Sequence, residues 1–170
     1  MPVIVQVGLL HGAVLCALMT ALIAFTLWWD PMIWSRSGPK DLQALVGPPS
    51  AATVRRKRAG GVVMMAILVS VFGHASAEVM ARSTGGFPAL EVALAAWIAF
   101  QCFNLWDAVV IDLGLVVFKP RWAFIPGTES LPGFREVRWH VVNYLRGFVG
   151  GFVFAGLVTA VAFAWSLIAA

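Results

Sequence analysis

The chain has 170 residues, of which 61% are hydrophobic and only 12% are charged. A soluble domain carries about 25% charged residues because its surface faces water, so this composition excludes an ordinary soluble fold. The formal net charge of +4 does not indicate nucleic acid, because the basic residues lie at the ends of apolar runs, where they anchor a protein to a membrane. We therefore expect one integral membrane domain over residues 1–170, surrounded by membrane lipids and without a nucleic-acid partner.

The first apolar run covers residues 3–29 and is long enough to cross a bilayer, which needs about 20 residues. It has no basic segment before it and is too long for a signal peptide, so we expect a retained helix. Trp28 and Trp29 mark a membrane interface, and the polar Asp30 with the proline after it ends the helix. The second predicted span covers residues 60–80.

The third apolar run covers residues 88–118, which is unusually long for one crossing. At a rise of about 1.5 Å per residue, this helix must tilt, kink or extend beyond the bilayer. The fourth run covers residues 147–170. Together the four runs predict an all-α integral membrane protein, a bundle of four transmembrane helices.

Small residues at every fourth position predict where helix backbones approach one another inside the membrane. The first span offers Gly8 and Gly12, and the fourth offers Gly147, Gly151 and Ala155. Lipid tails are as apolar as leucine, so close backbone packing takes the place of burial as the force that joins helices. This spacing is compatible both with packing inside the chain and with packing against another subunit.

Basic residues set the predicted orientation. Eleven of the twelve Lys and Arg residues lie within residues 30–59 and 119–146, and the twelfth is Arg82. The positive-inside rule then places both segments in the cytoplasm and both termini outside, in the plasma (inner) membrane. On the cytoplasmic side we expect short interfacial helices over residues 40–46 and 134–146.

The third span carries polar residues that lipid does not tolerate. Gln101, Asn104, Asp107 and Asp112 fall within an arc of about 140° on a helix. An ionised Asp inside a span costs at least about 2.5–3.5 kcal/mol on insertion scales, so these side chains need partners, water or protonation. The predicted polar intramembrane network comprises Gln101, Asn104, Asp107, Asp112, Glu129, His140 and Arg146. It is interpreted either as a structural network that holds the helices in register or as an ion, proton or substrate site.

Two histidines, His11 and His74, lie at matching depth on the first and second spans. They are candidate axial ligands of a b-type haem, with Gly8, Gly12 and Gly73 leaving room for a flat ring. Histidines in spans are also typical of hydrogen-bonded contacts between helices. Beyond this haem the sequence predicts no cofactor and no metal site, and its two cysteines are far apart inside apolar runs.

One block of the chain resembles a set of small bacterial four-span membrane proteins. Those proteins combine an Asn-Leu-x-Asp-x-x-x-x-Asp helix with a Pro-Gly-Thr-Glu turn. The matching residues here are Asn104-Leu105-Trp106-Asp107, Asp112 and Pro126-Gly127-Thr128-Glu129, with His140 beyond them. The resemblance covers about residues 104–147. No activity is known for that set, so the resemblance implies no particular chemistry.

The sequence is compatible with three functions. The leading hypothesis is a non-enzymatic accessory subunit that packs against other integral membrane subunits of a larger complex, such as a lipid or solute transporter or a respiratory assembly. It rests on the small extramembrane mass, the lack of known catalytic motifs and the many small-residue ridges. The alternatives are a b-type haem-binding anchor of an electron-transfer complex, and a small membrane enzyme or ion or proton pathway that uses Asn104, Asp107 and Asp112.

Overall fold

The computed structural model describes residues 2–169, which form helices, turns and loops without a β-strand. Four helical segments are long and apolar enough to cross a membrane. They are α1 (Val3–Trp29), α3 (Ala51–Arg82), the segment Ala89–Phe118 and α6 (Val137–Ala169). The predicted all-α, four-helix transmembrane fold is therefore confirmed.

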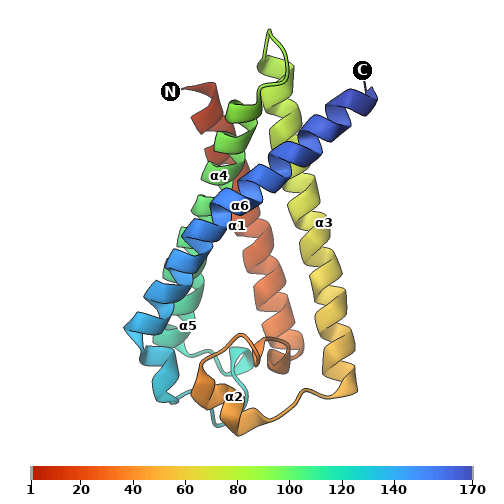
Figure 1. The fold of residues 1–170 in the computed structure, drawn as a ribbon. Helices are drawn as coiled ribbons and strands as arrows, with labels where there is room; N and C mark the ends of the chain where they lie inside the picture. Colours follow the sequence, from red (N-terminus) through yellow and green to blue (C-terminus); the bar gives the residue numbers. More distant parts are fainter. Residues whose placement is uncertain (1, 170) are drawn as a thin grey trace.

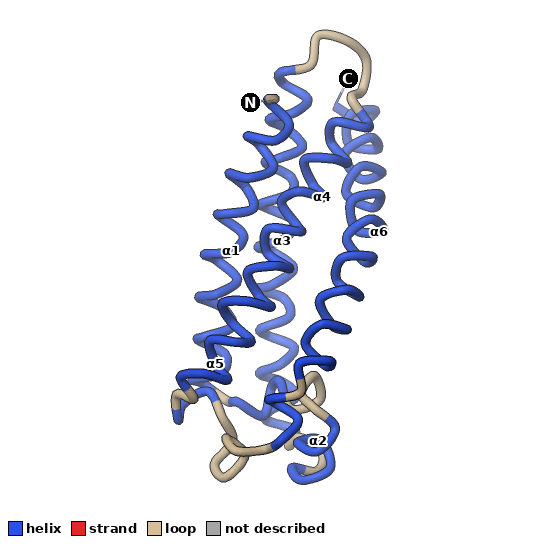
Figure 2. The backbone as a smooth tube through the Cα atoms, turned by 90° about the vertical axis from the view of Figure 1, so that its left-hand side faces the viewer, coloured by secondary structure: helices blue, strands red, loops and turns tan. Residues whose placement is uncertain are grey.

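The two ends of the bundle differ. Both chain termini lie at one end, next to the short turn between α3 and the third span (Figure 1). The long connections over residues 30–50 and 119–136 lie at the opposite end, where Figure 2 shows them as loops and short helices below the spans. We call these the terminal end and the loop end. Residues 30–59 and 119–146 enter the bundle from the loop end, and they hold eleven of the twelve Lys and Arg residues.

Two spans begin earlier than hydropathy predicts. Helix α3 starts at Ala51 rather than at residue 60, because Ser50 caps it by accepting a hydrogen bond from the Thr53 amide at 3.1 Å. Helix α6 starts at Val137 and runs on unbroken. The interfacial helix predicted over residues 134–146, leading into the fourth span, is therefore largely the beginning of α6 itself.

The other predicted interfacial helix is present as α2 (Lys40–Val46), and Gly47 ends it with a φ of 63°. That left-handed conformation suits glycine because glycine lacks a Cβ atom.

The overlong third span is not one regular α-helix. It consists of α4 (Ala89–Trp106), a π-helical turn η2 (Asp107–Asp112) and α5 (Leu113–Phe118). A π-helical turn holds more residues than an α-helical turn, so it changes the direction in which the following side chains point. Both predicted carboxylates lie within this turn.

Glycines bring α1 and α6 close to α4. A Cβ atom added to Gly8 would lie 2.7 Å from the Ile98 Cβ, and one added to Gly12 would lie 2.7 Å from the Cys102 Cβ. On α6, Gly151 lies against the Gln101 side chain in the same way. The small residues predicted for helix packing thus act between helices of this chain.

The core is apolar and divided into layers along the bundle. A middle layer joins all four spans and comprises Leu15, Met19, Val71, Phe72, Ala96, Ala99 and Ala155. A second layer lies toward the terminal end and includes Val7, Val79 and Val92. A third layer at the loop end joins Leu27 to Ala123 and Phe124.

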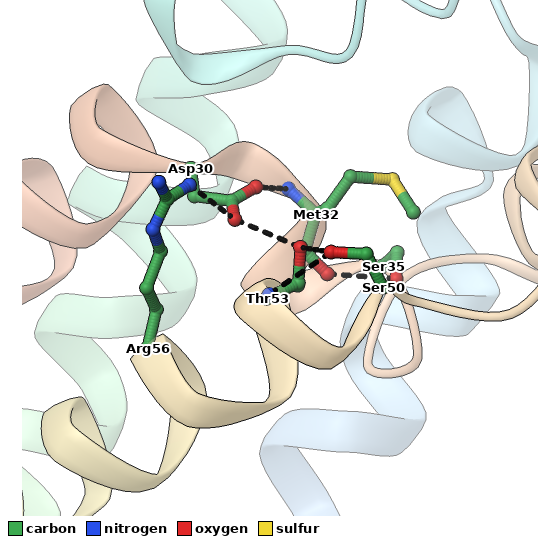
Figure 3. Close-up of polar contacts among 6 residues, drawn as sticks. All are labelled: Asp30, Met32, Ser35, Ser50, Thr53 and Arg56. Carbon is green, nitrogen blue, oxygen red and sulfur yellow. Dashed lines mark hydrogen bonds and ion pairs between the residues drawn. The ribbon is translucent and has the colours of Figure 1, made fainter.

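A hydrogen-bonded cluster around Asp30 ties the end of α1 to the start of α3 (Figure 3). The Asp30 side chain is buried, and its carboxylate accepts hydrogen bonds from the Met32 amide at 3.1 Å, the Thr53 hydroxyl at 2.9 Å and the Arg56 guanidinium at 3.0 Å. The Arg56 guanidinium also lies 5.4 Å from the centre of the Trp29 ring. These contacts fix the beginning of α3 relative to the membrane-interface tryptophans.

The two long connections are also joined to each other. The carboxylate of Asp41 in α2 accepts a hydrogen bond from the Gly133 amide at 2.8 Å, and Gly133 belongs to the short helix η4 (Pro132–Arg135). The indole N–H of Trp34, in the short helix η1 (Pro31–Trp34), donates to the Thr26 hydroxyl at 2.9 Å. The loop end is therefore a folded cap on the bundle.

Candidate functional site

A cavity of about 280 Å³ lies under this cap, between the loop end and the spans. Its walls come from α1, η1, α2, η2, α5, η4 and α6, so residues far apart in the sequence meet there. Its polar lining comprises Ser35, Ser37, Asp107, Asp112, Thr128, His140 and Asn143. Its aromatic lining comprises Trp34, Phe124, Phe134 and Trp139.

Asp107 is the charged group of this cavity for which the described part of the chain supplies no partner. Its side chain is half-buried and lines the cavity, and within residues 2–169 its carboxylate makes no hydrogen bond and no ion pair. It is the first residue of the π-helical turn η2. Such turns occur frequently at functional sites, because they aim side chains that a regular helix would place elsewhere.

Asp112, at the other end of the same turn, does have a partner. One of its carboxylate oxygens lies 3.2 Å from the Nδ1 atom of His140 on α6. The Nε2 atom of His140 lies 2.9 Å from the backbone carbonyl oxygen of Phe134. Both partners are acceptors, so the ring satisfies them together when both of its nitrogens carry hydrogen. The result is a bridge between η2, α6 and η4.

Gln101 and Asn104 lie deeper in the membrane and join α4 to α6. The Gln101 amide donates to the Phe148 carbonyl oxygen at 3.2 Å, and the Asn104 amide donates to the Tyr144 carbonyl oxygen at 3.2 Å. Asn104 also donates to the Gln101 side chain at 3.3 Å. A Cβ atom at Gly147 would collide with the Asn104 amide, so the glycine makes this contact possible.

The predicted polar network is thus divided by the structure. Gln101 and Asn104 form one helix-joining pair, and Asp112 with His140 forms another. Glu129 and Arg146 belong to neither: within residues 2–169 both lack a hydrogen bond or ion pair, and Arg146 is exposed. Asp107 lines the same cavity as Asp112 and His140.

Several cavity residues are absent from the polar network that the sequence predicts. Trp34 and Ser35 belong to the connection after α1 and reach the cavity because the cap folds back under the spans. Thr128 is fully buried in the turn that the sequence singles out, and its hydroxyl donates to the Ile125 carbonyl oxygen at 2.7 Å. Asn143 lies three residues after His140 on α6, and this helical spacing is the one signal that points to it.

The cavity also differs in charge from its surroundings. The segments that enter at the loop end hold eleven of the twelve Lys and Arg residues, yet among the described residues no Lys or Arg side chain lines the cavity. Its charged groups are two carboxylates, and one of them is paired with His140. The lining is therefore acidic within a basic end of the molecule.

The two other histidines lie toward the terminal end, on either side of a shallow hollow. The Nδ1 atom of His11 donates to the Val7 carbonyl oxygen at 3.0 Å, and its Nε2 atom lies 3.8 Å from the Glu78 carboxylate. The room predicted for a haem beside Gly8 and Gly12 is filled by α4. Beside Gly73 no neighbouring atom lies within 4 Å of an added Cβ atom, and haem binding by His11 and His74 stays a prediction.

Within residues 2–169, no group of three or more His, Cys, Asp or Glu side chains is placed to hold a metal ion. Cys16 and Cys102 are free thiols, and Cys16 is buried.

Comparisons with protein-family models, with curated proteins and with solved structures found no match for this chain. The cavity and its residues are therefore what points to a function. Four residues that the sequence singles out, Asp107, Asp112, Thr128 and His140, line the cavity, and Asn104 lies one helical turn before Asp107.

Proposed function

We propose that this membrane protein binds a small organic cation in the cavity at its loop end, with the Asp107 carboxylate as counter-ion. The proposal rests on one observation. The Asp107 carboxylate has no hydrogen-bond or ion-pair partner within residues 2–169, and no Lys or Arg side chain of these residues lines the cavity. A carboxylate removed from water needs a compensating charge or hydrogen-bond donor. A cationic ligand supplies the charge, and an ammonium group that carries hydrogen supplies the donor as well.

The side chains that line the cavity favour binding of an organic cation over binding of a metal ion. Four aromatic side chains line the cavity together with aliphatic ones, and the face of an aromatic ring attracts a cation by about 0.5–2 kcal/mol. A volume of about 280 Å³ equals that of about nine liquid water molecules. These features suit an ammonium group that carries a compact apolar substituent.

The arrangement supports binding rather than acid–base catalysis. In catalytic carboxylate–histidine pairs, the carboxylate orients one ring nitrogen and the other nitrogen reaches the reacting group. Here the Nε2 atom of His140 is bonded to the Phe134 carbonyl oxygen instead. His140 and Asp112 therefore hold the wall of the site, and Asp107 is the group left for the ligand.

The site is better suited to a ligand that enters from the loop end than to a route across the membrane. The middle apolar layer lies between Asp107 and the His11–Glu78 contact, because Leu15 and Met19 follow His11 along α1. On α4, Ala99 of the same layer precedes Asp107. A polar path from one end to the other would have to cross this layer.

The small-residue ridges, which first favoured an accessory subunit, give less support to that role. Gly8 and Gly12 pack on α4, Gly147 and Gly151 pack on side chains of α4, and Ala155 lies in the core. These contacts are made inside one chain, so they do not require a partner subunit. In the proposed orientation the loop end faces the cytoplasm, where the positive-inside rule places it.

The proposal is tested with purified protein in nanodiscs, titrated with benzyltrimethylammonium and with its neutral isostere neopentylbenzene. Binding is measured by calorimetry and by the fluorescence of the cavity tryptophans. Asp107→Asn removes the counter-ion, and Glu136→Gln removes an equal charge from an exposed position that does not line the cavity. Benzyltrimethylammonium has no N–H group, so it pairs with Asp107 by charge alone. Two opposite charges about 4 Å apart attract by about 1 kcal/mol in water and about 4 kcal/mol near a protein surface, so Asp107→Asn should weaken cation binding about 10- to 100-fold.

Glu136→Gln should leave the affinity within about threefold. Equal affinity of the wild-type protein for the cation and for its neutral isostere would overturn the proposal. Undiminished cation binding by the Asp107→Asn protein would overturn it as well.

A further inference from the structure

Four consecutive basic residues, Arg55 to Arg58, lie on the first two turns of α3. Hydropathy alone places them in a loop before the second span. In the structure they belong to a capped helix, and the Thr53 hydroxyl attaches this helix to the buried Asp30 carboxylate. Their backbone positions are therefore fixed before any partner arrives.

Arg56 differs from the other three. Its guanidinium is bonded to Asp30 and lies over the Trp29 ring. Arg55, Lys57 and Arg58 are exposed, and within residues 2–169 none of them has an acidic partner. These three positive charges are left for a partner outside the chain.

Arg55 and Arg58 share one side of the helix, because residues three apart are neighbours on a helix surface. Val62 and Val69 follow Arg55 by seven and fourteen residues, so they lie on nearly the same side, and they are 70% and 67% exposed. The two arginines therefore stand where the lipid-facing surface of α3 ends. Two like charges at this spacing repel each other, and an anion between them relieves the repulsion.

The depth of Arg55 and Arg58 in the membrane follows from the residues next to them. Arg56 contacts Trp29, so the first turns of α3 lie level with the end of α1. Trp28 and Trp29 are both exposed there. Exposed tryptophans at the ends of spans lie at the boundary between hydrocarbon and headgroups, which is the level of lipid phosphates.

We propose that Arg55 and Arg58 form a binding site for the phosphate of one anionic phospholipid. Guanidinium groups bind phosphate oxygens through paired, charge-assisted hydrogen bonds. Because the helix holds both arginines in place, little backbone order has to be gained on binding. This lipid site is separate from the cavity that holds Asp107, and it stands without the proposed cation binding.

The test measures binding of phosphatidylglycerol to the whole protein in phosphatidylcholine nanodiscs, by native mass spectrometry and by thermal stability. The double variant Arg55→Gln/Arg58→Gln is compared with Arg36→Gln/Lys40→Gln, which removes the same charge from exposed positions in the connection before α3. We expect about 30-fold weaker binding in the first variant, which corresponds to about 1 kcal/mol for each basic side chain. In the second variant we expect a change of less than about threefold.

Equal losses in the two variants would show a diffuse basic surface and would overturn the specific site. Unchanged binding in both variants would also overturn it. Saturation of the site by soluble glycerol phosphate in pure phosphatidylcholine nanodiscs would assign it to a free anion instead of a lipid. Near-ultraviolet circular dichroism in phosphatidylcholine shows that each variant is folded before lipid is added.

Discussion

Replacing Gly147 with alanine tests the contact that joins α6 to α4. The new Cβ atom would occupy the place of the Asn104 side-chain amide, so Asn104 would have to turn away. It would then lose its hydrogen bonds to the Tyr144 carbonyl oxygen at 3.2 Å and to the Gln101 side chain at 3.3 Å. Hydrogen bonds between membrane helices contribute about 0.6 kcal/mol each on average, and displaced side chains add to the cost. We expect the free energy of unfolding to fall by about 1 to 2 kcal/mol.

The measurement is reversible unfolding in mixed micelles, and α6 supplies its own control. Gly150 lies three residues further on the same helix, and a Cβ atom there would meet no other atom within 4 Å. Gly150→Ala should therefore leave the stability unchanged or slightly raised, since alanine favours helix. A third variant, Asn104→Ala with Gly147→Ala, should cost less than the sum of its two single changes. Equal effects of the two glycine changes, or strict additivity in the double variant, would refute this account of the contact.

Three further predictions concern the loop end. Arg56→Leu leaves the buried Asp30 carboxylate without its cation, and we expect the free energy of unfolding to fall by about 1 to 3 kcal/mol, less than for a fully buried pair because Arg56 is part-exposed. His140→Phe should destabilise the protein by leaving Asp112 unpaired, and adding Asp112→Asn should recover part of that loss. A cysteine at Lys57, in a protein without its native cysteines, should react with a membrane-impermeant maleimide only after the cells are opened.

The controls for these three predictions are further variants of the same chain. Arg55→Leu removes a charge without an acidic partner in the described chain, so a loss of stability equal to that of Arg56→Leu would contradict the assigned role of Asp30. If Asp112→Asn deepens the effect of His140→Phe, the two side chains do not form the inferred bridge. A cysteine at Thr84, which is exposed in the turn at the terminal end, should label in intact cells. Labelling of position 57 in intact cells would reverse the proposed orientation.

The positions of the four spans can be predicted from the sequence, because the interior of a bilayer accepts only long apolar segments. A segment that crosses must be apolar over about 20 residues, and four runs meet this condition. The residues at which the helices begin and end cannot be predicted from hydropathy in the same way. Hydropathy ends a span at its first charges, whereas a helix ends where its hydrogen bonds end. This is why Arg55 and Arg58 proved to be helical and why α6 begins before Arg146.

Parts of the candidate site could also be found from the sequence. Asp107, Asp112 and His140 stand out because ionisable side chains in a span need a reason to be there. Their pairing could not be found, since it depends on the π-helical turn and on how α6 packs against it. By charge and depth alone, Arg146 is an equally good partner for these carboxylates, but its side chain is exposed. The fold of the cap determines that His140, and not Arg146, lies next to Asp112. No periodic pattern in the sequence predicts that fold.

The proposed cation binding requires that Asp107 recognises positive charge inside the cavity at the loop end. The most direct measurement is the ratio of the dissociation constants of neopentylbenzene and benzyltrimethylammonium, in the wild-type protein and in Asp107→Asn. We predict that the wild-type protein prefers the cation by about 10- to 100-fold and that the preference disappears in the variant, while binding of the neutral compound changes little. A preference of the same size in both proteins would contradict the claim, because the positive charge would then be recognised elsewhere.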